Sequence, residues 1–415
     1  MRPLVPELRF PEFKGPWKPA RAGDAFRNSK AKGKAGLPIY SVTQDRGLVR
    51  RDSLERHMGA DAADETNLRA QPGDLVYNMM RMWQGAVGMA SEECMVSPAY
   101  VVLAPEKGIS SKFFDYWFQN RHMLHQLWAY SHGLTNDRLR LYYQDFAKIP
   151  LALPDQPEQE KIAAVLDATC RKITLLTDKK TALEDYKRGL MQRLFSRELR
   201  FTRDDGSAFP DWEERKLGDV FDWVQTNSLS REHLVDDPAS GVQNIHYGDI
   251  HGKYRALFFQ SKENAPFIAT TAPMRDIKAA EYLRVGDVVI ADASEDYADI
   301  GKAIEIMEVA HESAVAGLHT YIARPKAKSL VLGFSGYLLR SAPMRKQTMR
   351  IAQGISVLGV SKSNLEKLTF WLPQPDEQRK IAATLSAVDA KIDVLSQKIS
   401  EVEAFKKGLL QKLFV

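Results

Sequence analysis

The sequence predicts an α+β protein with two globular α+β domains, related by an approximate two-fold axis and joined by a long antiparallel two-helix coiled coil. Three observations lead to this prediction. One 43-residue passage occurs twice without a gap, at Leu153–Phe195 and Leu372–Phe414, with 21 identical positions. Both copies carry apolar residues at a coiled-coil period. The segments that precede the copies share β-rich landmarks.

The repeat divides the 415 residues into two similar halves. An internal repeat determines how the chain divides into structural parts, so it is considered before any local pattern. Each half is a globular segment followed by one copy of the passage. We therefore expect globular domains at 1–155 and 198–374 and long helices at 156–197 and 375–415.

Apolar residues recur in the repeated passage with alternating steps of four and three. This period predicts a coiled-coil seam rather than the broader stripe of a globular helix. Pro157 and Pro375 stand near the helix starts, where proline is tolerated, and about 38 helical residues would reach roughly 57 Å. The apolar seam positions are Ile162, Leu166, Ile173, Leu176, Leu183, Leu190 and Leu194 in the first copy and Ile381, Leu385, Val388, Ile392, Leu395, Ile399, Val402, Leu409 and Leu413 in the second.

Polar residues interrupt the seam at Thr169, Lys180 and Lys187 in the first copy and at Lys406 in the second. A polar seam residue can specify register or pairing; alternatively, these lysines lie near an open end and reach solvent. Each stripe needs a partner, because a long exposed apolar face is unfavourable. We expect the two helices to pack on each other, with separate pairing to another protein as the alternative.

Composition places the chain among ordinary globular proteins, with 44% hydrophobic and 27% charged residues. Neither a membrane span nor a signal peptide is expected. Cys94 and Cys170 are too few for a disulfide framework, which indicates buried thiols in a reduced, cytoplasmic protein. Residues 1–197 carry 30 Lys+Arg against 23 Asp+Glu, and residues 198–415 carry 28 against 30. The basic surplus that attracts phosphate therefore lies in the first half.

The two globular segments share landmarks in the same order. LRFPEF at 8–13 corresponds to LRFTRD at 199–204, and the Gly-Asp pairs at 23–24 and 73–74 correspond to those at 218–219 and 286–287. Such turns before β-rich runs predict hairpins. Elsewhere the segments diverge, which indicates one scaffold with two different recognition surfaces.

Each globular segment also contains one predicted helix, at 110–132 and at about 330–353, followed directly by a glycine. Glycine just past a helix end is the expected stop signal. A short β-rich run then leads into each long helix, at 146–153 and 368–372.

No catalytic centre is predicted. Ser97–Tyr100 approaches the tetrad of an amino-methyltransferase but lacks its second proline, and no glycine-rich nucleotide loop is present. A nuclease centre at Pro210-Asp211 with Glu214–Lys216 would be too short to span the strands of a metal site. The pairs His122/His125 and His246/His251 lack partners at ligand spacing, so we expect no metal.

Several motifs together resemble one family. EQEKIAA with YKRGLMQRLF and EQRKIAA with FKKGLLQKLF are similar to the two conserved regions of type I restriction–modification specificity subunits. NMMRMWQGAVG at 78–88 with VSPAY at 96–100 resembles one kind of target recognition domain of that family. DASEDYADIGKA at 292–303 with GLHT at 317–320 resembles another. The resemblance covers almost the whole chain.

The resemblance implies a subunit without chemistry of its own. Each target recognition domain would read one half of a bipartite sequence in double-stranded DNA, and the conserved helices would form the spacer. Two modification subunits with S-adenosylmethionine, and restriction subunits that use ATP and Mg²⁺, would be the partners; the chain itself would bind no cofactor. The runner-up is a DNA-binding scaffold of another methyltransferase-based defence system.

In the first domain, a basic stretch and two polar clusters are the expected DNA contacts. Lysines would clamp phosphates, although the stretch could also be a solvated loop, and Trp83 could belong to the core. Arginine can pair guanine bidentately, and asparagine or glutamine can pair adenine. The candidates are Asn28, Ser29, Lys30, Lys32, Lys34, Thr43, Gln44, Arg46, Asn78, Arg81, Trp83 and Gln84.

In the second domain, the corresponding stretch begins at Gln243. The acidic segment from Ser294 to Tyr297 takes the place of the Arg81 region; it either reads cytosine amino groups or faces away from DNA. The candidates are Gln243, Asn244, His246, Tyr247, Lys253, Arg255 and His319.

Overall fold

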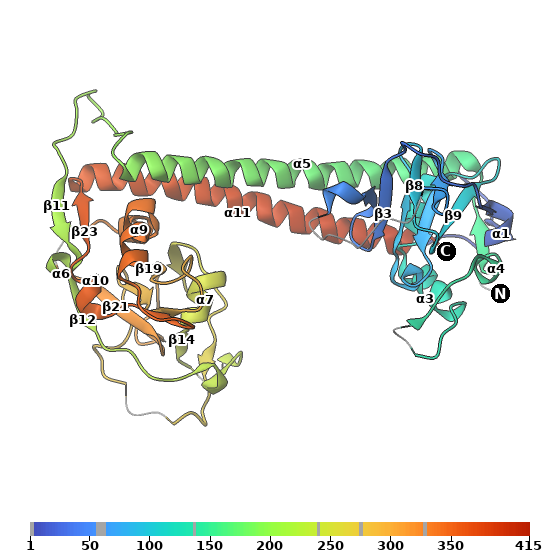
Figure 1. The fold of residues 1–415 in the computed structure, drawn as a ribbon. Coiled ribbons are helices and arrows are strands. Elements are labelled where there is room, and N and C mark those ends of the chain that lie inside the picture. Colours follow the sequence, from blue (N-terminus) through green and yellow to red (C-terminus); the bar gives the residue numbers. More distant parts are fainter. Residues whose placement is uncertain (1–3, 55–63, 136–137, 239–240, 274–276, 327–329) are drawn as a thin grey trace. The chain divides into compact units, whose positions relative to one another are not determined.

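The structure is a computed structural model that describes residues 4–54, 64–135, 138–238, 241–273, 277–326 and 330–415 (Figure 1). The chain forms two compact units. Unit 1 comprises Met1–Asp178 with Ser396–Val415, and unit 2 comprises Lys179–Leu395. Both units mix helix and sheet, and each contains one part of both long helices, so the predicted four-part division remains a prediction.

Unit 1 is built on two four-stranded sheets and a two-stranded ribbon. The first sheet has the order β2 (Phe26–Ser29), β9 (Tyr100–Pro105), β6 (Leu75–Asn78), β7 (Val87–Met89). The second has the order β4 (Gly47–Arg50), β3 (Ile39–Thr43), β8 (Cys94–Val96), β5 (Leu68–Ala70). The ribbon pairs β1 (Lys18–Arg21) with β10 (Pro150–Leu153), and the helices are α1 (Ala22–Ala25), α2 (Ser111–Trp117), α3 (Arg121–Ala129) and α4 (Tyr143–Phe146).

Unit 2 has a five-stranded sheet in the order β12 (Phe221–Val224), β21 (Thr320–Pro325), β17 (Val288–Ala291), β19 (Ala303–Glu308), β15 (Leu257–Phe259). A four-stranded sheet has the order β13 (Leu234–Val235), β16 (Phe267–Ile268), β14 (Gln243–Ile245), β20 (Ala314–Ala316). Two ribbons pair β11 (Glu213–Lys216) with β23 (Thr369–Leu372) and β18 (Ala293–Ser294) with β22 (Leu358–Gly359). The short helices are α6 (Leu217–Val220), α7 (Tyr247–Gly252), α8 (Phe334–Arg340), α9 (Ala342–Ile351) and α10 (Lys362–Leu365).

The two globular parts share one topology despite their divergent sequences. The order β2-β9-β6-β7 in unit 1 corresponds to β12-β21-β17-β19 in unit 2. The parallel pair β3–β8 likewise corresponds to the parallel pair β14–β20. Strand pairing therefore repeats even where the side chains do not.

The Gly-Asp landmarks form the same turn in both units. Asp24 and Asp219 accept a hydrogen bond from the backbone N–H three residues earlier, at 2.8 and 3.3 Å. Asp74 and Asp287 do the same at 2.8 Å each. The preceding Gly73 and Gly286 both have φ of +92°, which favours glycine. A local signal that was visible in the sequence thus sets up equivalent strands in each unit.

The two predicted mid-domain helices are each broken in two. In unit 1, α2 ends at Trp117, and the side chain of Asn120 accepts hydrogen bonds from the first backbone N–H groups of α3. In unit 2, α8 ends at Arg340, and Pro343 lies in the first turn of α9. A capping side chain and a proline are both start signals, so a single continuous helix was the wrong prediction.

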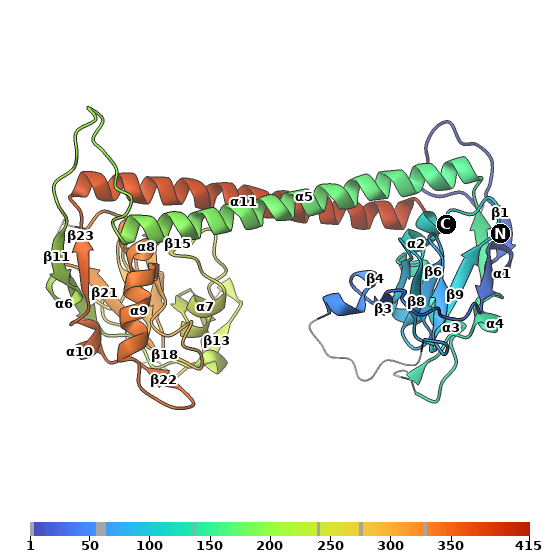
Figure 2. The same ribbon diagram turned by 45° about the horizontal axis from the view of Figure 1, so that its top comes forward.

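The long helices are α5 (Gln156–Phe195) and α11 (Pro375–Lys412). In unit 1, the first part of α5 packs in one core with the last part of α11, and Asn120 Nδ2 donates to Leu410 O at 2.5 Å. In unit 2, the last part of α5 packs with the first part of α11. The two helices therefore run antiparallel (Figure 2).

No helix in the described part of the chain is long and apolar enough to cross a membrane.

The apolar seam positions predicted from the sequence are all buried or half-buried in the structure. Ile162 and Leu166 belong to the core of unit 1, whereas Ile381 and Leu385 belong to the core of unit 2. Lys187 interrupts the seam of unit 2, where its Nζ lies 2.7 Å from Oδ1 of Asp389 on α11. This lysine does not simply reach solvent: it makes an ion pair across the two helices.

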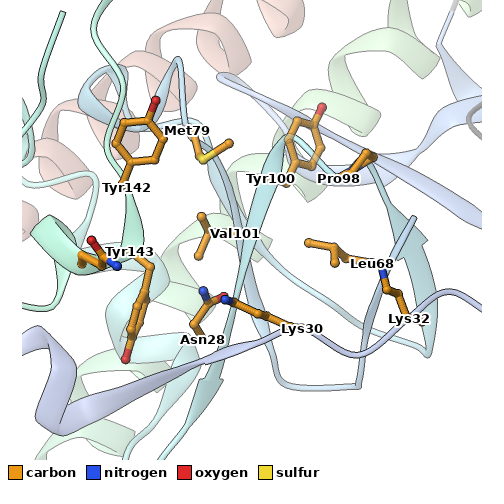
Figure 3. A pocket seen from close by; sticks show the side chains of 11 residues that line it. Asn28, Lys30, Lys32, Leu68, Met79, Pro98, Tyr100, Val101, Tyr142 and Tyr143 are labelled. Carbon is orange, nitrogen blue, oxygen red and sulfur yellow. The ribbon is translucent and has the colours of Figure 1, made fainter. Parts of the chain in front are cut away.

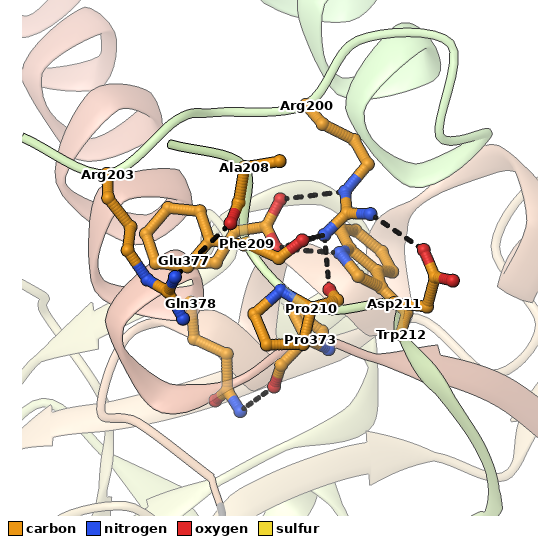
Figure 4. A network of polar contacts seen from close by, with 10 residues as sticks. All are labelled: Arg200, Arg203, Ala208, Phe209, Pro210, Asp211, Trp212, Pro373, Glu377 and Gln378. Carbon is orange, nitrogen blue, oxygen red and sulfur yellow. Dashed lines mark hydrogen bonds and ion pairs between the residues drawn. The ribbon is translucent and has the colours of Figure 1, made fainter. Parts of the chain in front are cut away.

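A buried glutamate in the first turn of each long helix binds the arginine of the LRF landmark. In unit 1, the Arg9 guanidinium donates to both oxygens of Glu158 at 2.8 Å. In unit 2, Arg200 and the indole N–H of Trp212 bind the fully buried Glu377 (Figure 4). The neighbouring Gln378 donates to Pro373 O at 2.8 Å. The shared EQ motif thus docks each domain onto its helix.

Candidate nucleic-acid interface

An open groove of about 820 Å³ lies on unit 1 between β2, β9 and the segment before α4. Asn28, Lys30 and Lys32 line one side of this groove, and the rings of Tyr100 and Tyr142 lie across from them (Figure 3). Both lysines are exposed, and the side chain of Tyr142 is 44% exposed. Cations beside aromatic rings suit the phosphates and bases of a nucleic acid.

The predicted basic stretch divides into residues that line the groove and residues that do not. Ser29, half-buried in β2, and the exposed Lys34 lie beside it in the chain. Thr43 and Arg46 belong to the β3–β4 hairpin, where the Thr43 hydroxyl accepts from Arg46 N at 3.1 Å. Gln44 is exposed at the tip of this hairpin.

The segment after β6 holds its polar side chains in a tight turn. Asn78 Oδ1 accepts from Met80 N at 3.0 Å, and Trp83 Nε1 donates to Met80 O at 3.1 Å. Arg81 is exposed, and its guanidinium donates to Oε1 of Gln84 at 3.1 Å. Arg81 is thus oriented by a neighbour and keeps further donors free. Trp83 is half-buried and supports the turn.

A second segment, absent from the sequence candidates, lies against this turn. Leu141 N donates to Met79 O at 2.9 Å, and a β-bridge joins His132 to Arg140 in the loop that follows α3. The described residues 132–135 and 138–141 therefore lie beside the Arg81 turn, with their ends joined by this bridge. Sequence reasoning missed it because the pairing of residues about sixty positions apart leaves no local signal.

In unit 2, an aromatic and histidine cluster takes the place of the lysines. The Tyr247 ring lies 4.6 Å from the ring of His246, 5.6 Å from His251 and 5.3 Å from His319, centroid to centroid. Burial lowers the pKa of His246 and His251, so both imidazoles are neutral near pH 7. Nδ1 of His246 accepts from Gly248 N at 3.1 Å, so this neutral ring offers its Nε2–H donor to an acceptor on a base edge.

His319 stands at a strained turn of this cluster. Its φ is +58°, in the left-handed region that non-glycine residues rarely adopt. The exposed ring places Nδ1 3.3 Å from Oδ1 of the half-buried Asp292. Strain of this kind is held by the surrounding fold and is frequent at binding sites.

Three sequence candidates of unit 2 have internal roles in the structure. Gln243 is 8% exposed, and its amide donates to Ala265 O at 3.1 Å; Asn244 is fully buried and accepts from Asn227 Nδ2 at 2.8 Å. Arg255 forms ion pairs with Asp389 and Asp393 of α11. These side chains are already bonded within the protein, and DNA binding by them stays a prediction that would require exchange of these partners.

Lys253 is exposed, with 47% of its side chain accessible. Its Nζ donates to Asn264 O at 2.9 Å, and the residue is exposed.

In the acidic segment, Ser294 is buried and accepts from Asp296 N at 3.0 Å, whereas Tyr297 is 55% exposed. A loop after α9 pairs with this segment through β18 and β22. The bridge Gln353–Gly359 and the hydrogen bond from Val360 N to Asp292 O correspond to the bridge His132–Arg140 and the hydrogen bond from Leu141 N to Met79 O in unit 1.

The long helices carry large apolar side chains that no domain covers. In unit 1, Leu175 of α5 and Phe405 of α11 are 69% and 59% exposed. In unit 2, Tyr186 of α5 and Val394 of α11 are 58% and 51% exposed. Leu175 and Val394 occupy the same position of the repeat, as do Tyr186 and Phe405. Each unit therefore exposes an equivalent aliphatic and aromatic pair.

A family model and two curated relatives agree on the family to which this chain is similar. The family described as type I restriction modification DNA specificity domain matches residues 19–185 and 210–404. Two curated relatives come from Methanocaldococcus jannaschii. The putative type I restriction enzyme MjaX specificity subunit is 24% identical over 226 residues, which is 53% of this chain and 49% of that protein. The MjaVIII specificity subunit is 23% identical over 281 residues, 65% of this chain and 62% of that protein. The matches thus span about half to three-fifths of these relatives.

Solved structures show the same fold over nearly the whole chain. A chain from a study of complex assembly and conformational transition of the type I R-M system has a TM-score of 0.58 at 17% identity, covering 97% of this chain and 99% of that one. The type I restriction-modification S subunit from M. genitalium has a TM-score of 0.55 at 15% identity, with 99% of both chains covered. The HsdS subunit from Thermoanaerobacter tengcongensis has a TM-score of 0.51 at 16% identity, covering 97% and 98%.

Proposed function

Because the chain belongs to the family of type I restriction modification DNA specificity domains, we propose that it is the non-catalytic specificity subunit of a type I restriction–modification complex. One observation carries the proposal: the family matches twice, and each match combines a globular part with a long helix. Two domains of one topology with different surface chemistry suit two different DNA half-sites. The proposed role places the chain in the cytoplasm, with its DNA.

Unit 1 would bind its half-site through the groove and the adjoining turn. Lys30, Lys32 and the neighbouring Lys34 supply charge for phosphates, which positions the domain without reading sequence. Arg81 is exposed and oriented by Gln84, which leaves guanidinium donors for the two acceptors of guanine. Phosphate binding and base reading thus come from adjacent segments of one surface.

Unit 2 would read its half-site by different chemistry. His246, Tyr247 and His319 form an accessible cluster, whereas Gln243, Asn244 and Arg255 are used internally. Lys253 is the exposed cation of this stretch. We infer that unit 2 depends less on phosphate charge and more on hydrogen bonds, consistent with the weaker basic balance of its half.

The partners would bind the helices rather than the domains. The two equivalent pairs, Leu175 with Phe405 and Tyr186 with Val394, would accept two copies of one partner, because the repeat presents the same side-chain types twice. Large exposed apolar residues are typical of interaction sites. We propose two modification subunits here, which would bring S-adenosylmethionine; restriction subunits would bring ATP and Mg²⁺.

Methylation mapping combined with a binding assay tests this function. Methylated adenines in the native genome should define two half-sites at a constant separation. The purified chain, assembled with its modification subunits, should bind that bipartite DNA tightly and a scrambled duplex weakly. Methyl transfer by the chain alone, or equal affinity for both duplexes, would contradict the proposal.

A further inference from the structure

Each unit projects one aliphatic side chain entirely into solvent from the loop that adjoins its proposed reading segment. Leu134 in unit 1 is 99% exposed, and Ile355 in unit 2 is 102% exposed. These are the two most exposed large apolar side chains among the described residues. Both follow a glycine just after a helix, α3 in one unit and α9 in the other.

Corresponding β-bridges join the two ends of each loop. One joins His132 to Arg140 on either side of Leu134, and the other joins Gln353 to Gly359 on either side of Ile355. A Cβ on Gly133 would lie 2.5 Å from Arg138 O, and one on Gly354 would lie 2.0 Å from Val357 O. Only glycine permits so close an approach, so each exposed side chain directly follows a closely packed glycine.

Both loops are anchored beside the segments proposed to read bases. In unit 1, Leu141 N donates to Met79 O at 2.9 Å, next to the Arg81 turn. In unit 2, β22 pairs with β18 (Figure 2), and Val360 N donates at 2.9 Å to the backbone O of Asp292, whose side chain contacts the proposed reader His319. The same contact occurs in two domains whose sequences have diverged, which argues for a shared use rather than a chance exposure.

Charge indicates what covers these side chains. Arg138 and Arg140 are exposed in the segment that returns after Leu134, and Arg350 is exposed in α9, shortly before Ile355. An apolar tip with cations nearby in the chain fits a ligand that pairs a polyanionic backbone with apolar, stackable groups. DNA has both, and proteins use leucine and isoleucine to contact bases or to wedge between them.

We propose that Leu134 and Ile355 are apolar base-contact residues, each buried by bases of one half-site when the chain binds DNA. The inference rests on the proposed function and adds a residue class that hydrogen-bond reading does not include. In both units the proposed contact joins an aliphatic side chain to an apolar surface of a base. This surface is either the methyl group of a thymine or the face of an unstacked base.

Because both side chains are fully exposed in the free protein, their replacement leaves folding unaffected. Leu134→Ser should weaken binding of the chain with its modification subunits to the bipartite target by about tenfold, the loss expected when one aliphatic side chain can no longer be buried. Ile355→Ser should do the same through the other half-site. The matched control is Val285→Ser, which changes an aliphatic residue that is 53% exposed in the turn before β17.

DNA substitution distinguishes the two base surfaces. Uracil in place of each thymine would reproduce the Leu134→Ser loss at one base if the contact is a thymine methyl. Enhanced 2-aminopurine fluorescence at one step, lost in Leu134→Ser, would identify an unstacked base. Either result supports the inference.

Unchanged target affinity in both serine variants, with wild-type protein still discriminating target from scrambled DNA, would overturn the base contact and leave the proposed function intact. Failure of the wild-type complex to discriminate would instead refute the proposed function. The two failures are therefore separable in one set of binding curves.

Discussion

Arg81 and Arg255 show how one residue type takes opposite roles according to its surroundings. Arg81 is exposed on a turn, and its guanidinium donates to Oε1 of Gln84. Arg255 is half-buried and bonded to two aspartates of α11. A guanidinium already paired within the protein cannot also read guanine without losing that pair, so Arg255 would have to exchange an internal ion pair for a DNA contact, whereas Arg81 would not.

Replacing Arg81 by alanine should damage recognition of one half-site only. Loss of a bidentate contact to guanine costs about 1–3 kcal/mol. Relative to the wild-type protein, the variant should bind the intact target more weakly. It should bind DNA altered only in the unit 2 half-site more weakly by the same factor. Competition binding with base-substituted duplexes measures this. Arg27→Ala, an exposed arginine whose side chain is 72% accessible, is the control. A uniform loss across unrelated sequences would show that Arg81 binds phosphate instead.

The three lysines at 30, 32 and 34 should govern the salt dependence of DNA affinity. Each phosphate contact contributes about 0.9 to the slope of log affinity against log salt concentration. The triple change to glutamine should therefore lower the magnitude of the slope by up to about 3. Titrations from low to high salt measure it, with Lys14, Lys107 and Lys172 changed together as the control. An unaltered slope would contradict the clamp.

Glu305 should make the stability of unit 2 fall as pH rises. Burial raises the pKa of this carboxyl to about 7 although it accepts hydrogen bonds from Gly333 N and Gly336 N. Between about pH 4.5 and 7 the native state retains a proton that the unfolded chain has released, so the free energy of unfolding decreases across this window by about 3 kcal/mol and is constant above it. Urea unfolding followed by tryptophan fluorescence tests this. Glu305→Gln should remove the slope; a wild-type curve parallel to that of the variant would refute the assignment.

At the scale of elements, the seam of unit 2 is completed by an ion pair and a tyrosine. Lys187 Nζ lies 2.7 Å from both oxygens of Asp389, and Tyr337 OH of α8 donates to Oδ2 of Asp389 at 2.7 Å. Burial lowers the pKa of Lys187 even though Asp389 raises it. The equivalent positions in unit 1 are Lys406 and Cys170, which cannot form the same pair. The polar seam residues thus distinguish the two ends of the helix pair.

A double-mutant cycle on Lys187 and Asp389 should expose this coupling. Either single change, Lys187→Met or Asp389→Leu, leaves the other charge half-buried without its main partner and should cost about 1–3 kcal/mol of stability. The double change should cost less than the sum, because neither charge remains. Lys180→Met is the control, since Lys180 interrupts the same stripe with a side chain that is 33% exposed. Additive single effects in the unfolding curves would show that the pair is not coupled.

At the scale of the whole molecule, the length of the two helices should set the separation of the half-sites. If α5 and α11 run along the DNA, three heptads inserted after Asp178 and after Leu395 lengthen the spacer by about 31 Å. That is close to one DNA turn of about 34–36 Å, so the preferred gap should grow by about nine or ten base pairs. Binding selection from duplexes with randomised gaps measures this.

A single heptad provides the contrasting case. It adds about 10 Å, or about three base pairs, and turns one half-site away from its domain by roughly a third of a DNA turn. Affinity should then be weak at every gap. A preferred gap that is identical in both insertion variants and the parent protein would refute the spacer role.

The sequence alone determined the features that depend on local or periodic patterns. The repeat, the 3.5-residue period, the Gly-Asp turns and the EQ motif each act over a few residues or along one helix, so their meaning is readable without knowing the fold. The boundaries of α5 and α11 and the antiparallel order of their segments agree with that interpretation. The family resemblance rested on the same local motifs.

Only the tertiary structure decided which surface residues come together. It buried Gln243 and Asn244, committed Arg255 to α11, broke the mid-domain helices, and brought the loops of Leu134 and Ile355 beside the proposed readers. These outcomes depend on strand pairing between residues far apart in the chain and on hydrogen bonds that compete for each polar group. The spacing of residue types predicts neither the long-range strand pairing nor the hydrogen-bond partners, because a buried and an exposed asparagine look the same in a sequence.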